Sequence, residues 1–315
     1  LEADPVAPPE ADRTPQSIPD RPRRPRRPVP PRLPRPTMPE AASVAHTAML
    51  LAAALAGWAL LQLFVLGGLS QARAQQVLHA ELRQELAAET APTGAAITPG
   101  DPVALLAVPT LGLRQVVVEG TASGDLMTGP GHRRDTVLPG QAGVSILYGR
   151  SAAYGAPFRS VARLRAGDGL QVTTGQGEFV YRVDGIRRAG DPLPAPLDAG
   201  GARITLVTSE GDGPLASITP VRTVYVDATL VGEAATGPGG RSAGVPDAEK
   251  ALAGDRSVLP LLALCLQGLL LAVAATAVAL RRLPRRAVWP VAAGIVVALA
   301  WASTDAAAQL LPNLL

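Results

Sequence analysis

The sequence is poor in cysteine and in aromatic residues. Its single cysteine, Cys265, excludes an intrachain disulfide as a source of stability. Phe, Trp and Tyr together make up 3% of the 315 residues, whereas the chain contains 32 glycines and 31 prolines. This composition is typical of a loop-rich β domain flanked by linkers and by membrane helices built from small residues. The length leaves room for one sizeable domain and several additional segments.

The net charge of +3 is modest for this length but very unevenly distributed. Residues 1–40 are rich in Pro and Arg, most densely at 21–28. Proline at this density prevents helix and sheet formation and predicts a disordered tail. Such a tail could bind nucleic acid or anionic lipid, could present a proline-rich ligand, or could mark the cytoplasmic side of a membrane helix. We favour the third interpretation, because a membrane helix follows, and we expect no nucleic-acid partner.

Residues 41–69 form the first long apolar run. From Val44 to Arg73 there is no intervening formal charge, which exceeds the roughly 20 residues that a bilayer span requires. A cleaved signal peptide is the alternative, but the long preceding tail and the long apolar stretch favour an uncleaved anchor. Because the positive charge precedes the span, we expect the tail in the cytoplasm and the following domain outside. His46 and Gln62 lie within this span and are assigned no role.

Residues 70–102 predict a stalk helix followed by a linker. Leu78, Leu82 and Leu86 recur every fourth residue among polar side chains, which is typical of a helix that rests an apolar stripe on a neighbour. Residues 91–102 are rich in Pro, Gly and Thr and are expected to be the linker.

The C-terminal part of the chain predicts two further membrane helices. A linker at 232–257 precedes an uncharged span at 258–280, and a second span follows at 287–304. Between them, residues 281–286 carry four arginines, which places this short loop in the cytoplasm. The tail at 305–315 would then lie on the outer side, as would the domain between the first two spans.

Between the first two spans, residues 103–231 change to short β segments with turn signals between them. Their rapid succession predicts a β-barrel or β-sandwich rather than alternating strands and helices. The length is sufficient for one independent core. The expected strands are 104–108, 115–119, 144–148, 169–174, 178–186, 203–208 and 223–230, with a short helical turn within 157–164.

This region also carries motifs that resemble, in their order along the chain, those of the sortase family and, within it, of class E. The resemblance covers nearly all of residues 103–231 and implies a closed β-barrel held outside the cell by the three membrane helices. The matching motifs are Leu106–Leu113 (LAVPTLGL), Val118–Thr121 (VEGT), Leu126–His132 (LMTGPGH), Tyr154–Phe158 (YGAPF), Ile204–Ser209 (ITLVTS) and Arg222–Val226 (RTVYV).

The resemblance identifies three site positions, and two of them depart from the family pattern. Sortases cleave a sorting peptide at a Thr-Gly bond and pass the acyl group to an amine, using a Cys nucleophile, a His and an Arg. In this chain Ser209 stands at the Cys position, Arg150 stands at the His position, and Arg222 matches the Arg. A serine hydroxyl is a far weaker nucleophile than a thiolate and needs an adjacent base, and a guanidinium does not accept a proton near neutral pH.

Other residues could in principle restore the chemistry. His132 of the Gly-Pro-Gly-His turn is one candidate base, although it is more simply interpreted as a turn-stabilising residue. His79 of the stalk would have to fold over the site, and Cys265 lies in an expected membrane span.

We therefore expect a catalytically inactive, membrane-anchored sortase-like protein that binds a sorting-signal peptide or an envelope protein, with Arg150, Ser209 and Arg222 in the binding site. The first alternative is a divergent transpeptidase or hydrolase that uses Ser209, and the second is a membrane subunit of a larger envelope complex. No cofactor or metal is expected.

Overall fold

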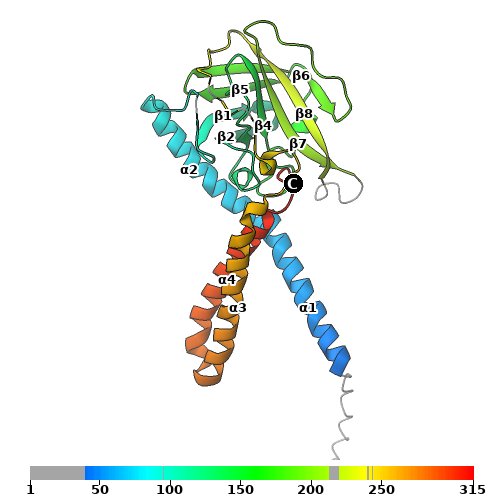
Figure 1. Cartoon of the computed structure of the whole chain (residues 1–315), viewed down its shortest axis with the longest axis vertical. Helices are drawn as coiled ribbons and strands as arrows, with labels where there is room; N and C mark the ends of the chain where they lie inside the picture. The colour runs from blue at the N-terminus through cyan, green and yellow to red at the C-terminus, as the bar shows by residue number, and fades with distance from the viewer. Residues whose placement is uncertain (1–39, 95, 213–219, 240, 243) are drawn as a thin grey trace, which may run out of the picture. The chain divides into compact units, whose positions relative to one another are not determined.

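The computed structural model describes all residues except 1–39, 95, 213–219, 240 and 243 (Figure 1). The expected N-terminal tail therefore lies outside the described residues, apart from Glu40, which begins helix α1 (Glu40–Leu61). The chain divides into two compact units, Leu1–Met49 and Leu50–Leu315, and every element after α1 lies in the second.

Eight strands form a closed barrel, which confirms the mainly β fold class. Their order around the barrel is β1-β2-β3-β4-β7-β8-β6-β5, with β5 pairing back to β1. The β2–β3 and β4–β7 pairs are parallel, and the other pairs are antiparallel. The strands are β1 (Pro102–Val108), β2 (Leu113–Glu119), β3 (Gly131–His132), β4 (Gly143–Tyr148), β5 (Gly169–Thr174), β6 (Gly177–Arg188), β7 (Ala202–Gly211) and β8 (Pro220–Val231).

All seven expected strands are present, and the short helical turn is the 3-10 turn η4 (Val161–Arg163). The additional strand β3 was missed because two residues give no periodic signal. Pairing with the adjacent strands stabilises β3, because Gly131 and His132 pair with both β2 and β4.

The barrel interior is filled by apolar side chains that alternate along the strands. In β6, for example, Phe179, Tyr181 and Val183 are buried while the residues between them are exposed. Each such side chain contributes roughly 1.5–3 kcal/mol by leaving water. The strand β7 differs because Ala202–Ser209 are buried at every position, so both of its faces are covered.

Helix α2 (Gly67–Ala87) lies against β1 and β2 (Figure 1). Two leucines of the expected stripe, Leu78 and Leu82, are buried against Val116 and Val118. A buried glutamine, Gln75, adds polar contacts: its Oε1 accepts from the Val116 N–H at 2.7 Å, and its Nε2 donates to the carbonyls of Val116 and Thr128 at 3.0 and 2.9 Å. The stalk helix is therefore part of the folded domain.

Among the described residues, three helices are long and apolar enough to cross a membrane, namely Ala53–Ala87, Arg256–Arg282 and Arg285–Ala308. The first runs from α1 into α2 through a π-helical turn, η1 (Gln62–Leu66). The other two are α3 (Leu259–Arg282), extended at its start by the 3-10 turn η7 (Arg256–Val258), and α4 (Arg285–Ala308). Both extend into the expected basic loop, because arginine is a good helix former and only Leu283 and Pro284 separate the helices.

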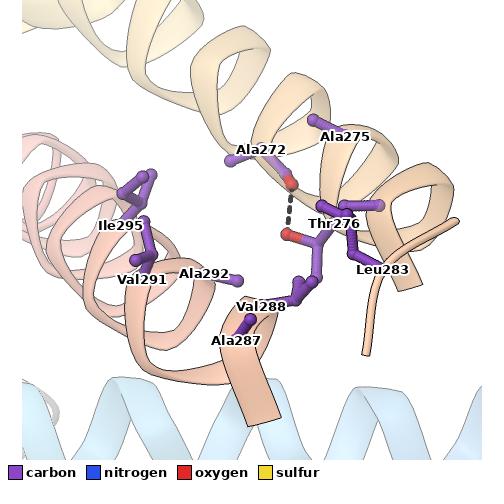
Figure 2. A pocket seen from close by; sticks show the side chains of 10 residues that line it. Ala272, Ala275, Thr276, Leu283, Ala287, Val288, Val291, Ala292 and Ile295 are labelled. Atoms are coloured by element: carbon purple, nitrogen blue, oxygen red, sulfur yellow. Dashed lines mark hydrogen bonds between the residues drawn. The ribbon is translucent and has the colours of Figure 1, made fainter. Parts of the chain in front are cut away.

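A groove of about 320 Å³ runs between α3 and α4 (Figure 2). It is lined largely by alanine, valine and isoleucine side chains. The hydroxyl of Thr276 points at the backbone of its own helix, where it donates to the Ala272 carbonyl at 2.7 Å. The groove is therefore apolar, as expected for helices that pack in lipid.

The loop after β2 packs against the linker that precedes α3. Thr121 Oγ1 donates to the Glu249 carbonyl at 2.8 Å, and the Glu249 carboxylate forms an ion pair with Arg134. Within the loop, the carboxyl of Asp125 accepts from the Ala122 N–H at 3.2 Å. Burial of this carboxyl raises its pKa to about 6.

Replacing Gln75 tests the docking of α2. The change Gln75→Leu should lower the free energy of unfolding by about 2 kcal/mol, because it leaves buried backbone groups of β2 and Thr128 without their partner. Thermal or chemical unfolding of the detergent-solubilised chain measures this. The matched change Gln76→Leu, at an exposed position of the same helix, should have little effect. Equal effects of the two changes would contradict the role given to Gln75.

The partly buried carboxyl of Asp125 predicts a pH dependence. Its folded pKa of about 6 exceeds the ordinary value of 3.8, so its contribution to stability is complete below pH 3.8 and is lost as the pH rises to about 6. Between those pH values the unaltered chain should lose about 2–3 kcal/mol of unfolding free energy relative to Asp125→Asn. Chemical unfolding of both proteins across this range measures the difference, and parallel pH profiles would refute the prediction.

Candidate functional site

Ser209 lies near the end of β7, between β4 and β8. Only 6% of its surface is exposed. Its Oγ lies 2.8 Å from the carbonyl oxygen of Leu314 and 2.9 Å from the hydroxyl oxygen of Ser151. A carbonyl and an alcohol are very weak bases, so neither partner activates the Ser209 hydroxyl near neutral pH.

Ser151 meets Ser209 because β4 and β7 run parallel and in register up to the pair Tyr148↔Val207. The alignment continues past β4, where Thr208 Oγ1 donates to the Gly149 carbonyl at 2.9 Å. The backbone N–H and the hydroxyl of Ser151 each lie 3.0 Å from the carbonyl oxygen of Leu314.

Two residues further on, the Ala153 N–H donates to the Leu315 carbonyl at 3.0 Å. We name Ser151, Ala153 and Ser209 the serine site. Its hydroxyls and backbone N–H groups converge on the main chain of residues 314 and 315, so the arrangement binds peptide carbonyls.

Arg150 is completely buried next to this site. Its Nη2 donates to the carbonyl and the hydroxyl of Ser123 at 2.9 and 2.8 Å, and its guanidinium lies 5.2 Å from the centre of the Tyr154 ring. Within the described part of the chain, its Nε and Nη1 have no hydrogen-bond partner. Burial lowers the pKa of Arg150 to about 10, which still leaves it protonated at neutral pH. It is a fixed cation and not a proton acceptor.

The backbone around Arg150 is tightly constrained. A Cβ on Gly149 would lie 2.3 Å from the Phe158 ring, so only glycine fits before Arg150. Tyr154 and Ala156 have φ values of 48° and 45°, which side chains other than glycine rarely adopt. Such conformations persist where the surroundings impose them, and they are common at functional sites.

Arg222 lies apart from the serine site. In the β7–β8 pair Ser209 is opposite Thr223, whereas Arg222 is opposite Glu210. Because successive side chains of a strand point to opposite faces, Arg222 shares the face of Glu210 and not that of Ser209. Its side chain is 49% exposed, and its Nη2 donates to Asp212 at 2.5 Å. The carboxylates of Asp212 and Glu210 thus offset its charge.

The histidine candidates are engaged elsewhere. The Nδ1 of His132 lies 2.8 Å from the Glu119 carboxylate, and its Nε2 lies 2.9 Å from the Val137 carbonyl. With both ring nitrogens occupied in a buried cluster, His132 is a structural residue of the turn. His79 faces the α2–barrel contact, where it lines a cavity with Leu82 and Arg114.

The segment 309–315 covers the serine site. Asn313 and Leu314 are completely buried, and Leu315 is 6% exposed. Leu314 packs with Leu126, Tyr148 and Val207, which come from the loop after β2, from β4 and from β7. Figure 1 shows the C-terminal end of the traced chain beside the barrel.

A polar junction joins the helices to the barrel loop. Asp305 of α4 accepts from the Gln62 amide at 2.8 Å, from the Tyr154 hydroxyl at 2.8 Å and from the Trp301 indole at 2.9 Å. The Tyr154 N–H donates to the Leu63 carbonyl in the π turn at 3.2 Å. Burial and the Asp305 carboxylate raise the pKa of Tyr154, which keeps its hydroxyl protonated as a donor. We name Gln62, Tyr154, Trp301 and Asp305 the junction cluster.

Sequence reasoning missed Ser151, Tyr154, Asp305 and the 309–315 segment as parts of the site. One signal was present, because Asp305 follows directly on an expected membrane span and an acidic residue at such a position usually has a specific partner. The remaining residues carry no local pattern that points to their contacts. Among the described residues no group of three or more His, Cys, Asp or Glu side chains could hold a metal ion.

The family model described as sortase domain matches residues 106–224. Among curated proteins, sortase D from Bacillus subtilis (strain 168) is 32% identical over 84 residues, which is 27% of this chain and 41% of that protein. The chain therefore spans about two fifths of the length of the curated relative that it matches.

Two of the solved structures to which the chain is similar are also sortases. The Clostridium perfringens sortase D5 transpeptidase is 22% identical, with coverage of 51% of this chain and 98% of that one and a TM-score of 0.39. Sortase E from Streptomyces avermitilis is 28% identical, with coverage of 49% and 100% and a TM-score of 0.36. The family model and the closed barrel together identify residues 106–224 as a sortase-like domain, on a chain whose described part includes three candidate membrane spans.

Proposed function

We propose that this chain is a membrane-anchored sortase-like protein that no longer transfers acyl groups and instead holds a peptide or protein partner of the cell envelope. The observation that carries the proposal is the environment of Ser209, whose hydroxyl is bonded to a carbonyl and to another serine. On the motifs Gly129–His132 and Tyr154–Phe158, we assign the domain to a class E-like, degenerate branch of the family.

Acyl transfer needs a nucleophile, a group that moves its proton, and a donor for the developing oxyanion. Ser209 is the nucleophile position, but the residue at the proton-handling position, Arg150, is buried and stays protonated. His132 is committed to Glu119 and Val137, which counts against the divergent Ser209 enzyme. The thiol of Cys265 lies in α3, within a candidate membrane span.

Peptide binding requires only hydrogen-bond donors, and the serine site provides them. The serine site donates to main-chain carbonyls, as a groove for an extended peptide does. In this proposal Ser209 contacts the peptide directly and Arg150 fixes the loop that carries Ser151. Arg222 lies outside this set and forms a charged rim with Glu210 and Asp212.

The proposed topology has the N-terminal tail and the basic loop in the cytoplasm and the barrel outside. Arginine-rich stretches at 21–28 and 281–286 support it, since both flank candidate spans. The contact of segment 309–315 with the barrel supports it independently, because the barrel and this segment must then lie on the same side. Two candidate spans, α3 and α4, lie between the barrel and this segment, and an even number of crossings returns the chain to the same side.

A transfer assay on the full-length chain in lipid nanodiscs tests the proposal. A labelled sorting-signal peptide with a Thr-Gly bond and triglycine as the amine should give no more product than a protein-free sample, and Ser209→Ala should change nothing. The double variant Arg150→His, Ser209→Cys restores the family pattern and serves as the matched comparison. Product formed by the unaltered chain and abolished by Ser209→Ala would overturn the proposal.

A further inference from the structure

The segment 309–315 is bound to the barrel as a ligand would be. Its main chain contacts the serine site through the carbonyls of Leu314 and Leu315. The Ser151 N–H and the Ser209 hydroxyl donate to the Leu314 oxygen at 3.0 and 2.8 Å. The Ser151 hydroxyl also lies 3.0 Å from this oxygen, and its single hydrogen is directed either to it or to the Ser209 oxygen. This carbonyl therefore occupies the position that a bound peptide carbonyl needs.

The side chains of the segment are recognised as well as its backbone. The Asn313 amide donates to the carbonyls of Thr121 and Lys250 at 2.8 and 3.0 Å, and the Asn313 N–H donates to the Ala253 carbonyl at 2.8 Å. Leu314 fills an apolar site between Leu126 and Tyr148. These contacts define one polar subsite that accepts an amide donor, followed by an apolar one.

Leu315 occupies a second apolar subsite beside Ala152, Ala153 and Tyr154. Here the segment meets the junction cluster, because the Tyr154 hydroxyl donates to Asp305 in the last turn of α4. The segment, the loop after β4 and the end of α4 are thus connected through Tyr154.

The docked state leaves a polar atom of the segment unsatisfied. In the described part of the chain, the Oδ1 of Asn313 is buried without a hydrogen-bond partner. Such an atom reduces the net gain from docking. Docking of this segment therefore includes one desolvation cost that no hydrogen bond offsets, and a partner that satisfies this oxygen would gain by comparison.

We propose that residues 309–315 are a tethered ligand that closes the serine site, and that a partner peptide binds only after displacing it. The inference rests on the proposed function as a peptide-binding protein. The ligand class follows from the subsites: an uncharged peptide with an asparagine followed by two large apolar residues. Such a peptide presents one carbonyl to Ser151 and Ser209 and the next to Ala153.

Thiol accessibility measures closure directly. In the full-length chain carrying Cys265→Ser and Ser209→Cys, the new thiol should react slowly with a maleimide in detergent solution. Adding Leu314→Asp should raise the rate by roughly tenfold or more, because a charge cannot remain in the apolar subsite. The matched change Leu193→Asp, at a residue that is 81% exposed, should leave the rate unchanged. Equal rates with and without Leu314→Asp would overturn the inference.

Hydrogen exchange distinguishes release of the segment from unfolding. In Leu314→Asp the amides of Ser151 and Ala153 should lose protection, whereas those of β5 should keep it. If β5 also loses protection, Asn313→Ala replaces Leu314→Asp in both measurements, because it removes two hydrogen bonds without placing a charge in the core. Unchanged protection at Ser151 and Ala153 in a folded variant would contradict the inference.

Binding in trans completes the test. A fluorescent, amidated peptide with the sequence of residues 309–315 should bind the Leu314→Asp chain and not the unaltered chain, as measured by anisotropy. The same peptide with Asp in place of its sixth residue is the control. No binding to a chain whose site is open would refute the ligand class. The binding measurement and the transfer assay test different claims. Acyl transfer that depends on Ser209 would overturn the proposed function, whereas absence of peptide binding to the opened chain would overturn only the tethered ligand.

Discussion

The parallel pairing of β4 with β7 is the constraint on which the site depends. It aligns the ends of two strands that are about 60 residues apart in the sequence, so that Ser151 and Ser209 meet as a hydrogen-bonded pair. The close contact of Gly149 with Phe158 and the left-handed backbone at Tyr154 then direct the following loop. A parallel pair of this kind is fixed only by long-range contacts, so the geometry of the site belongs to the whole barrel.

The electrostatics of the site differ from those expected for a reactive centre. A buried cation without a carboxylate partner is unfavourable, and Arg150 is held by Ser123 and the Tyr154 ring instead. At the rim, Arg222 is neutralised by Asp212 and Glu210. The two cations therefore act in separate environments, and the serine site between strands is left with neutral donors suited to peptide carbonyls.

Much of the fold could be predicted from the sequence, and less of the site. The strands, the stalk helix and the apolar spans each carry a local period that the structure preserves. Arg150 and Ser209 were found because they interrupt ordered motifs, but the direction of Arg222 depends on the β7–β8 register, which no local pattern shows. Residues 309–315 were expected only as a tail, because the hydrogen bonds that join Asn313 and Leu314 to the rest of the fold involve residues more than 50 positions away.

The short path from the last candidate span to the serine site limits where a partner can be. Leu314 follows Ala308, the final residue of α4, by six residues (314 − 308), which extended chain spans in about 20 Å. With α4 in a bilayer, the site lies close to the lipid surface. A partner that is itself attached to the membrane would search for it in two dimensions and at a high effective concentration. A freely diffusing peptide has no such advantage and must compete with a segment that is permanently attached.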